Sequence, residues 1–174
     1  MVINLLREMG QRIAARGRRA TLYVVGGAAM VVSYGRKTST ADIDAVSREW
    51  DLIEQVAAEM ASDMSLPPNW LSSNAGGYIP GEHDAPYAQL IYGGLTVQVA
   101  SPRDMLAMKL RAFRAKDFDD ISLLVKHLQL RDTDAIVDVV LNRFDDDSVP
   151  PSSREETQLV ASRALRIAWG EASP

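Results

Sequence analysis

The chain has 174 residues, of which 47% are hydrophobic and 24% are charged. This length fits a single domain, and the composition is that of a globular protein with a core rather than of a disordered or fibrous chain. With no cysteine and only two histidines, the chain excludes disulfides and zinc sites built from clusters of these residues. A metal ion would have to be bound by carboxylates, which favours Mg²⁺ or Mn²⁺.

The charges are unevenly distributed along the chain. A net charge of −4 does not favour nucleic acid as a partner, but residues 1–20 contain five arginines whereas residues 132–147 contain six aspartates. The uncharged, largely apolar stretch over residues 20–35 is shorter than the roughly 20 apolar residues of a membrane helix and is interrupted by Gly26 and Gly27. There is no secretory signal either, so we expect a cytoplasmic protein without a membrane partner.

The first part of the chain predicts helices alternating with short strands. Leu6, Met9 and Ile13 have helical spacing, and Gly17 ends that amphipathic pattern. The elements expected next are a strand over 21–25, a helix over 28–34 after the Gly-Gly turn, a strand over 42–46 and a helix that begins near Trp50.

The second part of the chain predicts a loop, a hairpin and a run of helices. Residues 65–86 are expected to form a long surface loop with a short strand around Tyr78, and Gly93-Gly94 is expected to join two antiparallel strands. The ranges are 87–92 and 95–100 for these strands and 104–114, 118–128, 133–143 and 155–169 for the helices, the last with a capping box of Ser153 and Glu156.

These elements predict an α+β fold. We expect a small mixed or antiparallel sheet with flanking helices, followed by a helical C-terminal half. The expected domain covers residues 1–144, and residues 145–174 are expected to form a linker and a C-terminal helix that packs on the same domain.

The pattern that carries chemistry is a Gly-Gly turn followed by an Asp-x-Asp strand. Asp42 and Asp44 lie two residues apart on a strand, so both side chains point to one face while Ile43 enters the core. Two carboxylates on one face can hold two Mg²⁺ ions, which suits phosphoryl or nucleotidyl transfer. Gly26 and Gly27 would let backbone N–H groups approach a triphosphate at a helix N-terminus. Taken alone, each half is more often a solvated strand face or a simple turn.

In this order and spacing, the residues resemble the DNA polymerase β-like nucleotidyltransferase superfamily. Within it, the chain resembles the AbiEii and MenT toxin group over two blocks, LYVVGGAAMVVSYGRKTSTADIDAV (22–46) and SPRDMLAMKLRAFRAKDFDDISLL (101–124). The resemblance implies an NTP co-substrate and a divalent metal, Mg²⁺ or Mn²⁺, at Asp42 and Asp44. It further implies catalytic roles for Lys109, Asp117 and Asp120, transfer to an RNA and a cognate antitoxin protein.

The residues between the turn and the strand are additional candidates for nucleotide binding. Arg36 and Lys37 could reach a nucleotide or an RNA backbone, although surface solubility explains them equally well. Thr40 could contact a phosphate, although Ser/Thr loops are more often turns. With Gly26 and Gly27, these residues form the expected nucleotide-binding set.

The second block also has a reading from its spacing alone. In one continuous helix, Lys109 and Asp120 would lie about 16 Å apart, too far to serve one site, so we expect a helix break between them. Asp117 as the cap of a new helix is the simpler explanation for its presence. Many superfamily members carry a third carboxylate on a later strand, but this chain has Gln98 there, which puts a complete metal triad in doubt.

Three functions remain open from the sequence. The first is a toxin-like enzyme that transfers a nucleoside monophosphate from an NTP to an RNA 3′ end, with tRNA as the expected acceptor, and thereby inhibits translation. The second is a nucleotidyltransferase that modifies a hydroxyl of a small molecule or protein. The third is a degenerate member that binds nucleotide without chemistry, for which Gln98 is the argument.

Overall fold

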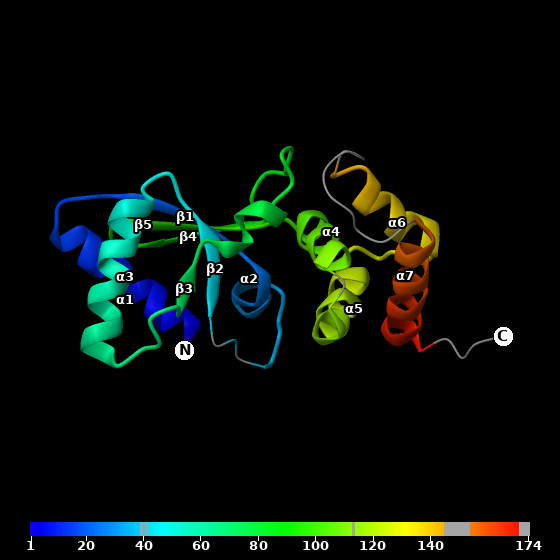
Figure 1. Ribbon diagram of the computed structural model, residues 1–174, viewed down its shortest axis with the longest axis horizontal. Coiled ribbons are helices and arrows are strands. Elements are labelled where there is room, and N and C mark those ends of the chain that lie inside the picture. The colour runs from blue at the N-terminus through cyan, green and yellow to red at the C-terminus, as the bar shows by residue number, and fades with distance from the viewer. Residues whose placement is uncertain (39, 41, 113, 145–153, 171–174) are drawn as a thin grey trace. The chain divides into compact units, whose positions relative to one another are not determined.

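The computed structural model describes residues 1–38, 40, 42–112, 114–144 and 154–170. The chain divides into two compact units (Figure 1). One comprises residues 1–77 and 86–100 and contains the sheet; the other comprises residues 78–85 and the chain from Ser101 onward and is helical.

The first unit is built on a five-stranded mixed sheet in the order β3-β2-β1-β5-β4. Its strands are β1 (Ala20–Val25), β2 (Ile43–Val46), β3 (Leu71–Ser72), β4 (Ala88–Tyr92) and β5 (Leu95–Val99). The central strand β1 runs antiparallel to β2 and parallel to β5, and β4 and β5 form the predicted hairpin.

Side-chain alternation gives this sheet a core face and a more polar face. Ile43 and Ala45 of β2 are buried, whereas Asp44 between them is partly exposed. Strand β1 is buried along most of its length, as expected for a central strand. The alternation is therefore confirmed for Ile43 to Val46. Because β2 begins at Ile43, Asp42 precedes the strand rather than lying on it with Asp44, and the shared face of the two carboxylates stays a prediction.

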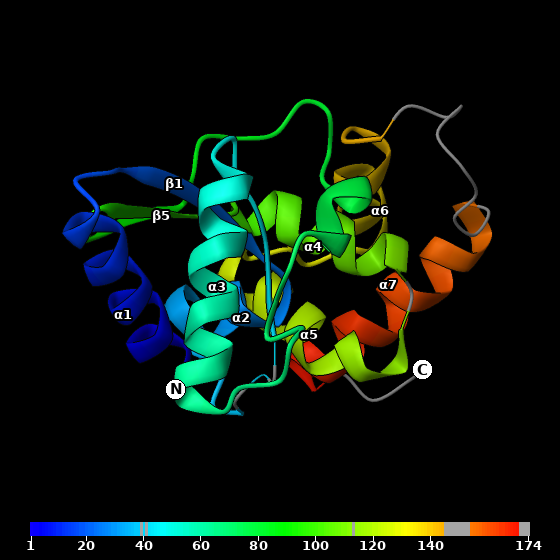
Figure 2. The same ribbon diagram turned by 60° about the vertical axis from the view of Figure 1, so that its left-hand side comes forward.

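Three helices pack around the sheet, α1 (Val2–Ala15), α2 (Gly26–Ser33) and α3 (Trp50–Met64). Helix α1 contacts the hairpin strands and lies beside α3 (Figure 2). Its approach to the hairpin is so close that a Cβ atom on Gly10 would lie 1.8 Å from the carbonyl oxygen of Tyr92. The buried stripe includes Leu6, Met9 and Ile13, as predicted.

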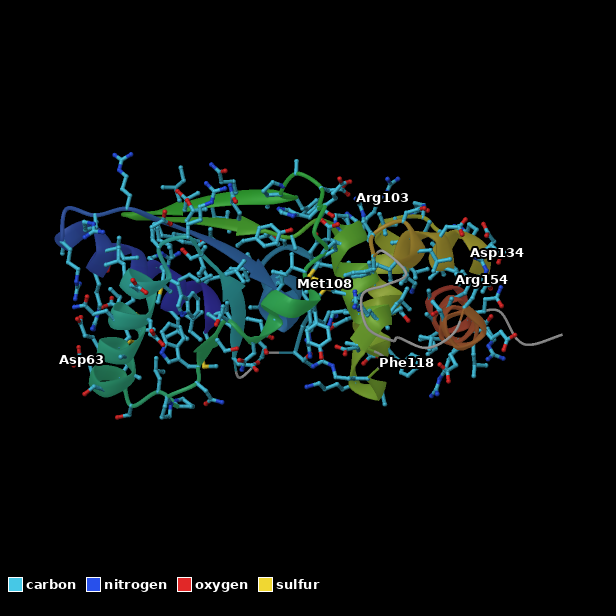
Figure 3. The ribbon with its side chains drawn as sticks, turned by 45° about the horizontal axis from the view of Figure 1, so that its top comes forward. Asp63, Arg103, Met108, Phe118, Asp134 and Arg154 are labelled. Carbon is cyan, nitrogen blue, oxygen red and sulfur yellow. The ribbon has the colours of Figure 1, made fainter. Side chains whose placement is uncertain are left out.

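The second unit contains four helices, α4 (Pro102–Ala112), α5 (Phe118–His127), α6 (Thr133–Leu141) and α7 (Arg154–Trp169). Helix α7 packs on α5 and α6, and α4 packs on α5 and α6. Arg154 of α7 lies 4.0 Å from Asp134 and 3.6 Å from Asp138 of α6 (Figure 3). The break predicted between Lys109 and Asp120 is confirmed, because a short 3₁₀ helix, η2 (Ala115–Asp117), separates α4 from α5.

The α+β fold class is thus confirmed, with one local correction. The strand expected around Tyr78 is wrong: Asn74–Tyr78 forms a 3₁₀ helix, η1, and the extra strand lies earlier, at Leu71–Ser72. The indole of Trp70 donates to the carbonyl of Ala57 in α3, which holds the chain beside β2 at this point.

The expected capping box, linker and domain division stay predictions. The capping residue Ser153 and the linker over residues 145–152 lie outside the described residues. The division into a domain over 1–144 and a final segment over 145–174 stays a prediction. In the described part of the chain, none of the helices has both the length and the apolar character needed to cross a membrane.

Candidate functional site

The Gly26-Gly27 turn packs directly against the residues that precede and form β2. Gly26 has a φ of 62°, which favours glycine, and a Cβ atom there would lie 3.0 Å from Oδ2 of Asp44. A Cβ atom on Gly27 would lie 2.8 Å from Oγ1 of Thr40 and 3.1 Å from Nη1 of Arg36. Both glycines therefore permit a close approach that brings the turn against Thr40 and Asp44.

The strand register explains why Asp44 lies beside the turn. Asp44 pairs with Val25, the last residue of β1, and with Ser72 of β3. The hydroxyl of Ser72 donates to Oδ1 of Asp44 at 3.1 Å, and that of Thr40 donates to Oδ1 of Asp42 at 2.9 Å. Each carboxylate is thus oriented by a neighbouring hydroxyl, and Asp42 is exposed just before the strand.

Helix α2 begins within the same turn. Its N-terminal residues have no side-chain cap, and its cap residue Val25 has an extended backbone conformation. The first N–H groups of a helix have no partner inside that helix and favour anions through their partial positive charge. The turn therefore places backbone N–H groups of this kind against Asp44 and against Thr40, which hydrogen-bonds to Asp42.

Arg36 is part of this arrangement, whereas Lys37 is an exposed neighbour. The Arg36 side chain donates from Nε to Oγ1 of Thr38 at 2.9 Å and places Nη1 close to Gly27. Lys37 is exposed and lies next in the chain. Among the residues expected to bind nucleotide, the structure thus brings Gly26, Gly27, Arg36 and Thr40 together with the aspartate pair.

Gln98 lies on the same face of the sheet as Asp44. It pairs with Tyr23 of β1, two residues before Val25, and with Gln89 of β4. Its amide donates to the side-chain oxygen of Gln89 at 3.4 Å. This position supplies a neutral amide, and the described residues contain no group of three or more Asp, Glu, His or Cys side chains that could hold a metal ion.

Two carboxylates are nevertheless a donor set that fits Mg²⁺. This ion is commonly held by one or two carboxylates, with water and substrate phosphates completing its octahedral shell. Asp42 and Asp44 would offer hard oxygen ligands near the Gly26-Gly27 turn, whose backbone N–H groups are of the kind that suits phosphates. The residues present are consistent with a metal that binds together with a nucleotide.

In the helical unit, Lys109 forms a buried ion network with the two predicted aspartates. Its Nζ lies 2.8 Å from Oδ1 of Asp117 and 2.7 Å from Oδ2 of Asp120. Arg114 approaches Asp117 from the outside, with Nε 2.7 Å from Oδ2. Lys109, Asp117 and Asp120 are 4%, 4% and 2% exposed, so none of them is an ordinary surface charge.

The ion network also determines the hydrogen-bond partners and the pKa of Asp117. Although Asp117 immediately precedes α5, its side chain makes no capping hydrogen bond to that helix. Burial alone would raise the pKa of its carboxyl, but hydrogen bonds and charge from Lys109 and Arg114 outweigh burial and lower that pKa below its usual value. Asp117 therefore occupies the expected N-cap position, but its side chain does not cap α5, because its two carboxylate oxygens pair with Lys109 and Arg114.

Sequence reasoning missed two features of these units. Ser72 orients Asp44, but it lies in a segment that was expected to be a loop. Arg143 ties Asp84 to Asp104 in the helical unit, with distances of 2.6 Å and 3.3 Å. The only sequence signal for the second cluster was charge, and charge alone does not pair residues so far apart in the chain.

The basic N-terminal helix is less available to a partner than its sequence indicates. Arg12 pairs with Glu8 at 2.8 Å and with Asp63 of α3 at 2.7 Å, and Arg16 pairs with Glu59 of α3. Arg18 and Arg19, just beyond the helix, are exposed, and neither pairs with an acidic residue of the described part of the chain.

The family described as "Nucleotidyltransferase of unknown function (DUF6036)" matches residues 2–169. The match spans both compact units, including the Gly-Gly turn, the aspartate pair and the Lys109 network. No curated protein and no solved structure gave a match.

Proposed function

We propose, since the chain belongs to this family of nucleotidyltransferases, that it transfers a nucleoside monophosphate from an NTP to the 3′ end of an RNA. Family membership supports nucleotidyl transfer as the general activity. The acceptor that we propose is tRNA, whose modification would inhibit translation, as in the AbiEii and MenT toxins that the chain resembles.

The observation that carries this proposal is the contact of the Gly-Gly turn with Thr40 and Asp44. The backbone N–H groups at the start of α2 would bind triphosphate oxygens, with Arg36 adding positive charge beside Gly27. Ser72 and Thr40 hold the two carboxylates in position by hydrogen bonds. A triphosphate placed on this turn would lie beside both aspartates.

Asp42 and Asp44 would hold Mg²⁺ or Mn²⁺. When bound, such an ion supplies Lewis acidity for the attacking hydroxyl and charge neutralisation for the departing pyrophosphate. The chain's own groups bind and orient the nucleotide, which makes the transfer a problem of positioning and electrostatic stabilisation.

The proposal of a toxin with a cognate antitoxin rests on the second block. Lys109, Asp117 and Asp120 match that group's motif, and their burial as one ion network is consistent with a role in positioning α4 against α5. Exposed Arg18 and Arg19 are candidates for contacts with RNA phosphates.

A small-molecule or protein hydroxyl is the second acceptor class. Two observations favour it: the net charge of −4, and the pairing of Arg12 and Arg16 with acidic residues, which reduces the basic surface. Gln98 in place of a third carboxylate favours the further alternative of nucleotide binding without transfer.

One experiment separates these possibilities. The protein is incubated with each labelled NTP, Mg²⁺ and total RNA, and label is followed on RNA, protein and small molecules. The control pairs Asp44→Ala with Asp51→Ala, an exposed aspartate on α3. Label on RNA that disappears only with Asp44→Ala supports the proposal. Label on another acceptor indicates the second class, and nucleotide binding without transfer indicates a degenerate member.

A further inference from the structure

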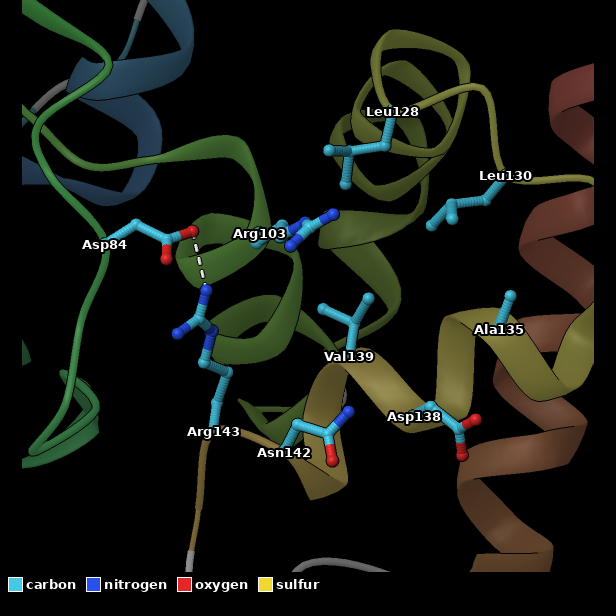
Figure 4. Close-up of a pocket in the computed structure, with 9 residues that line it drawn as sticks. All are labelled: Asp84, Arg103, Leu128, Leu130, Ala135, Asp138, Val139, Asn142 and Arg143. Carbon is cyan, nitrogen blue, oxygen red and sulfur yellow. Dashed lines mark ion pairs between the residues drawn. The ribbon is translucent and has the colours of Figure 1, made fainter.

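The helical unit contains a pocket of about 470 Å³ (Figure 4). This volume falls within the range of small-molecule sites in proteins, roughly 300 to 1,000 Å³. One side of the pocket is apolar and is formed by Leu128, Leu130, Ala135 and Val139. These side chains come from α6 and from the segment that follows α5, so the apolar surface rests on the helical framework.

The opposite side carries charged groups that form ion pairs with one another. Arg143 pairs with Asp84 at 2.6 Å and with the buried Asp104 at 3.3 Å. Asp104 also accepts hydrogen bonds from the hydroxyl of Ser101 and the backbone N–H of Asp84. Arg143 is therefore already paired with two carboxylates of the protein, so we do not expect it to bind a ligand.

Arg103 is the lining cation that remains for a ligand. It lies in the first turn of α4, is exposed, and makes no ion pair within 4 Å in the part of the chain that the structure describes. The N-terminal turn of a helix adds partial positive charge at the same point. Asn142, also exposed, supplies an amide on the same lining.

The acidic residues of the lining limit how much negative charge a ligand can bring. Asp84 and Asp138 both line the pocket, where Asp84 pairs with Arg143 and Asp138 lies 3.6 Å from Arg154 of α7. A dianionic phosphate would be repelled by two aspartates, whereas a monoanion needs only the guanidinium of Arg103. A carboxylate also matches a guanidinium with two parallel hydrogen bonds.

We propose that this pocket binds a small monocarboxylate with a branched apolar body. The carboxylate pairs with Arg103, the apolar body lies on Leu128, Leu130 and Val139, and Asn142 donates to a second polar group of the ligand. This site is independent of the nucleotidyltransferase site, since it uses none of the residues assigned there.

The test is a titration of the isotope-labelled full chain with N-acetyl-leucine, followed by NMR. The proposal requires saturable shifts of signals from residues that line the pocket. N-acetyl-leucinamide, which lacks the charge, and acetate, which lacks the apolar body, should each bind at least tenfold more weakly. Isopentyl phosphate should also bind more weakly than the carboxylate.

Three variants test whether the ligand binds in this pocket. Arg103→Gln should raise the Kd for N-acetyl-leucine about tenfold or more, because a charge-assisted hydrogen bond is lost. Val139→Phe should weaken binding by filling the pocket without a change of charge. Arg163→Gln is the matched control, since Arg163 lies over the ring of Phe118 and is not part of the lining.

Three results would overturn the proposal: no saturable shift with N-acetyl-leucine, equal binding of the amide, or equal Kd values for the native chain and Arg103→Gln. Because Arg103 is exposed, its replacement tests binding without threatening the fold. The readout does not depend on nucleotidyl transfer, so failure here leaves the proposed activity untouched.

Discussion

At the scale of single residues, the aspartate pair gives the most direct prediction. Asp42→Ala and Asp44→Ala should each abolish nucleotidyl transfer, because each removes a proposed metal ligand. Neither change opens a core cavity, since Asp42 is exposed and Asp44 is only partly buried, so the melting temperature should change little. Turnover with labelled NTP and a thermal melt measure both effects. Full turnover in both variants would contradict the metal assignment.

Gly27 tests the turn itself. In Gly27→Ala, the new methyl group would lie 2.8 Å from Oγ1 of Thr40 and 3.1 Å from Nη1 of Arg36, so both side chains must move. We expect at least a tenfold loss of kcat/KM for NTP, which corresponds to about 1.4 kcal/mol of transition-state stabilisation. Gly77→Ala is the control, because a Cβ atom there has no neighbour within 4 Å. Equal kinetics in the two variants would remove the turn from the proposed site.

Replacing Lys109 is predicted to lower the free energy of unfolding. Lys109→Ala would remove the ion pairs of Lys109 with the buried Asp117 and Asp120, while Arg114 would still pair with Asp117, and losses for such broken buried pairs are about 3–5 kcal/mol. Urea unfolding at neutral pH measures this loss. Lys116→Ala, an exposed control, should stay within about 0.5 kcal/mol of the native chain.

The same network sets a direction for pH. The pKa of Asp117 is lowered in the folded chain, so its contribution to stability is complete above the ordinary value of 3.8 and is lost as the pH falls through the lower, folded-state pKa. The stability difference between the native chain and Lys109→Ala should therefore shrink in acid. A difference that stays constant down to full protonation would show that the charge network does not stabilise the fold.

At the scale of elements, the contact of α1 with the β4–β5 hairpin changes the expected effect of Gly10→Ala from stabilising to destabilising. Alanine is a better helix former than glycine by about 1 kcal/mol, so the sequence alone predicts that Gly10→Ala stabilises α1. In the structure the new Cβ atom would lie 1.8 Å from the carbonyl oxygen of Tyr92, which forces α1 away from the hairpin. We expect a net loss of about 1–3 kcal/mol in urea unfolding, as for other overpacked sites. Gln11→Ala, exposed on the same helix, should be neutral or slightly stabilising, and a gain at position 10 would show that the contact is loose.

Elements with a strong local pattern were predictable, and those held by distant contacts were not. The hairpin around Gly93-Gly94 and the helix break before Asp120 follow from local spacing and were found where expected. The strand at Leu71–Ser72 has only two residues and depends on pairing with β2, a contact that no local periodicity encodes. The burial of Lys109 was equally unpredictable. The sequence around a lysine in an apolar helix does not show whether acidic residues elsewhere in the chain pair with it.

At the scale of the whole molecule, the distribution of charge in space differs from its distribution in sequence. The arginines of residues 1–20 form a basic cluster along the chain, yet Arg12 and Arg16 are compensated by acidic residues of α3. Only contacts between helices far apart in sequence reveal this pairing. A surface that binds RNA therefore has to be sought among the exposed arginines rather than among all the basic residues.

That distinction can be measured by salt dependence. If Arg18 and Arg19 contact RNA phosphates, replacing both with Gln should reduce the slope of log affinity against log salt by about 0.7 for each lost contact on single-stranded RNA. Replacing Arg12 and Arg16 with Gln should change the slope little, because their guanidinium groups already pair with Asp63 and Glu59. Filter binding of tRNA over a range of salt concentrations gives both slopes at the same change of net charge. Equal slopes for the two double variants would mean that only overall charge matters, and a slope near zero in the native chain would point to a small-molecule or protein acceptor.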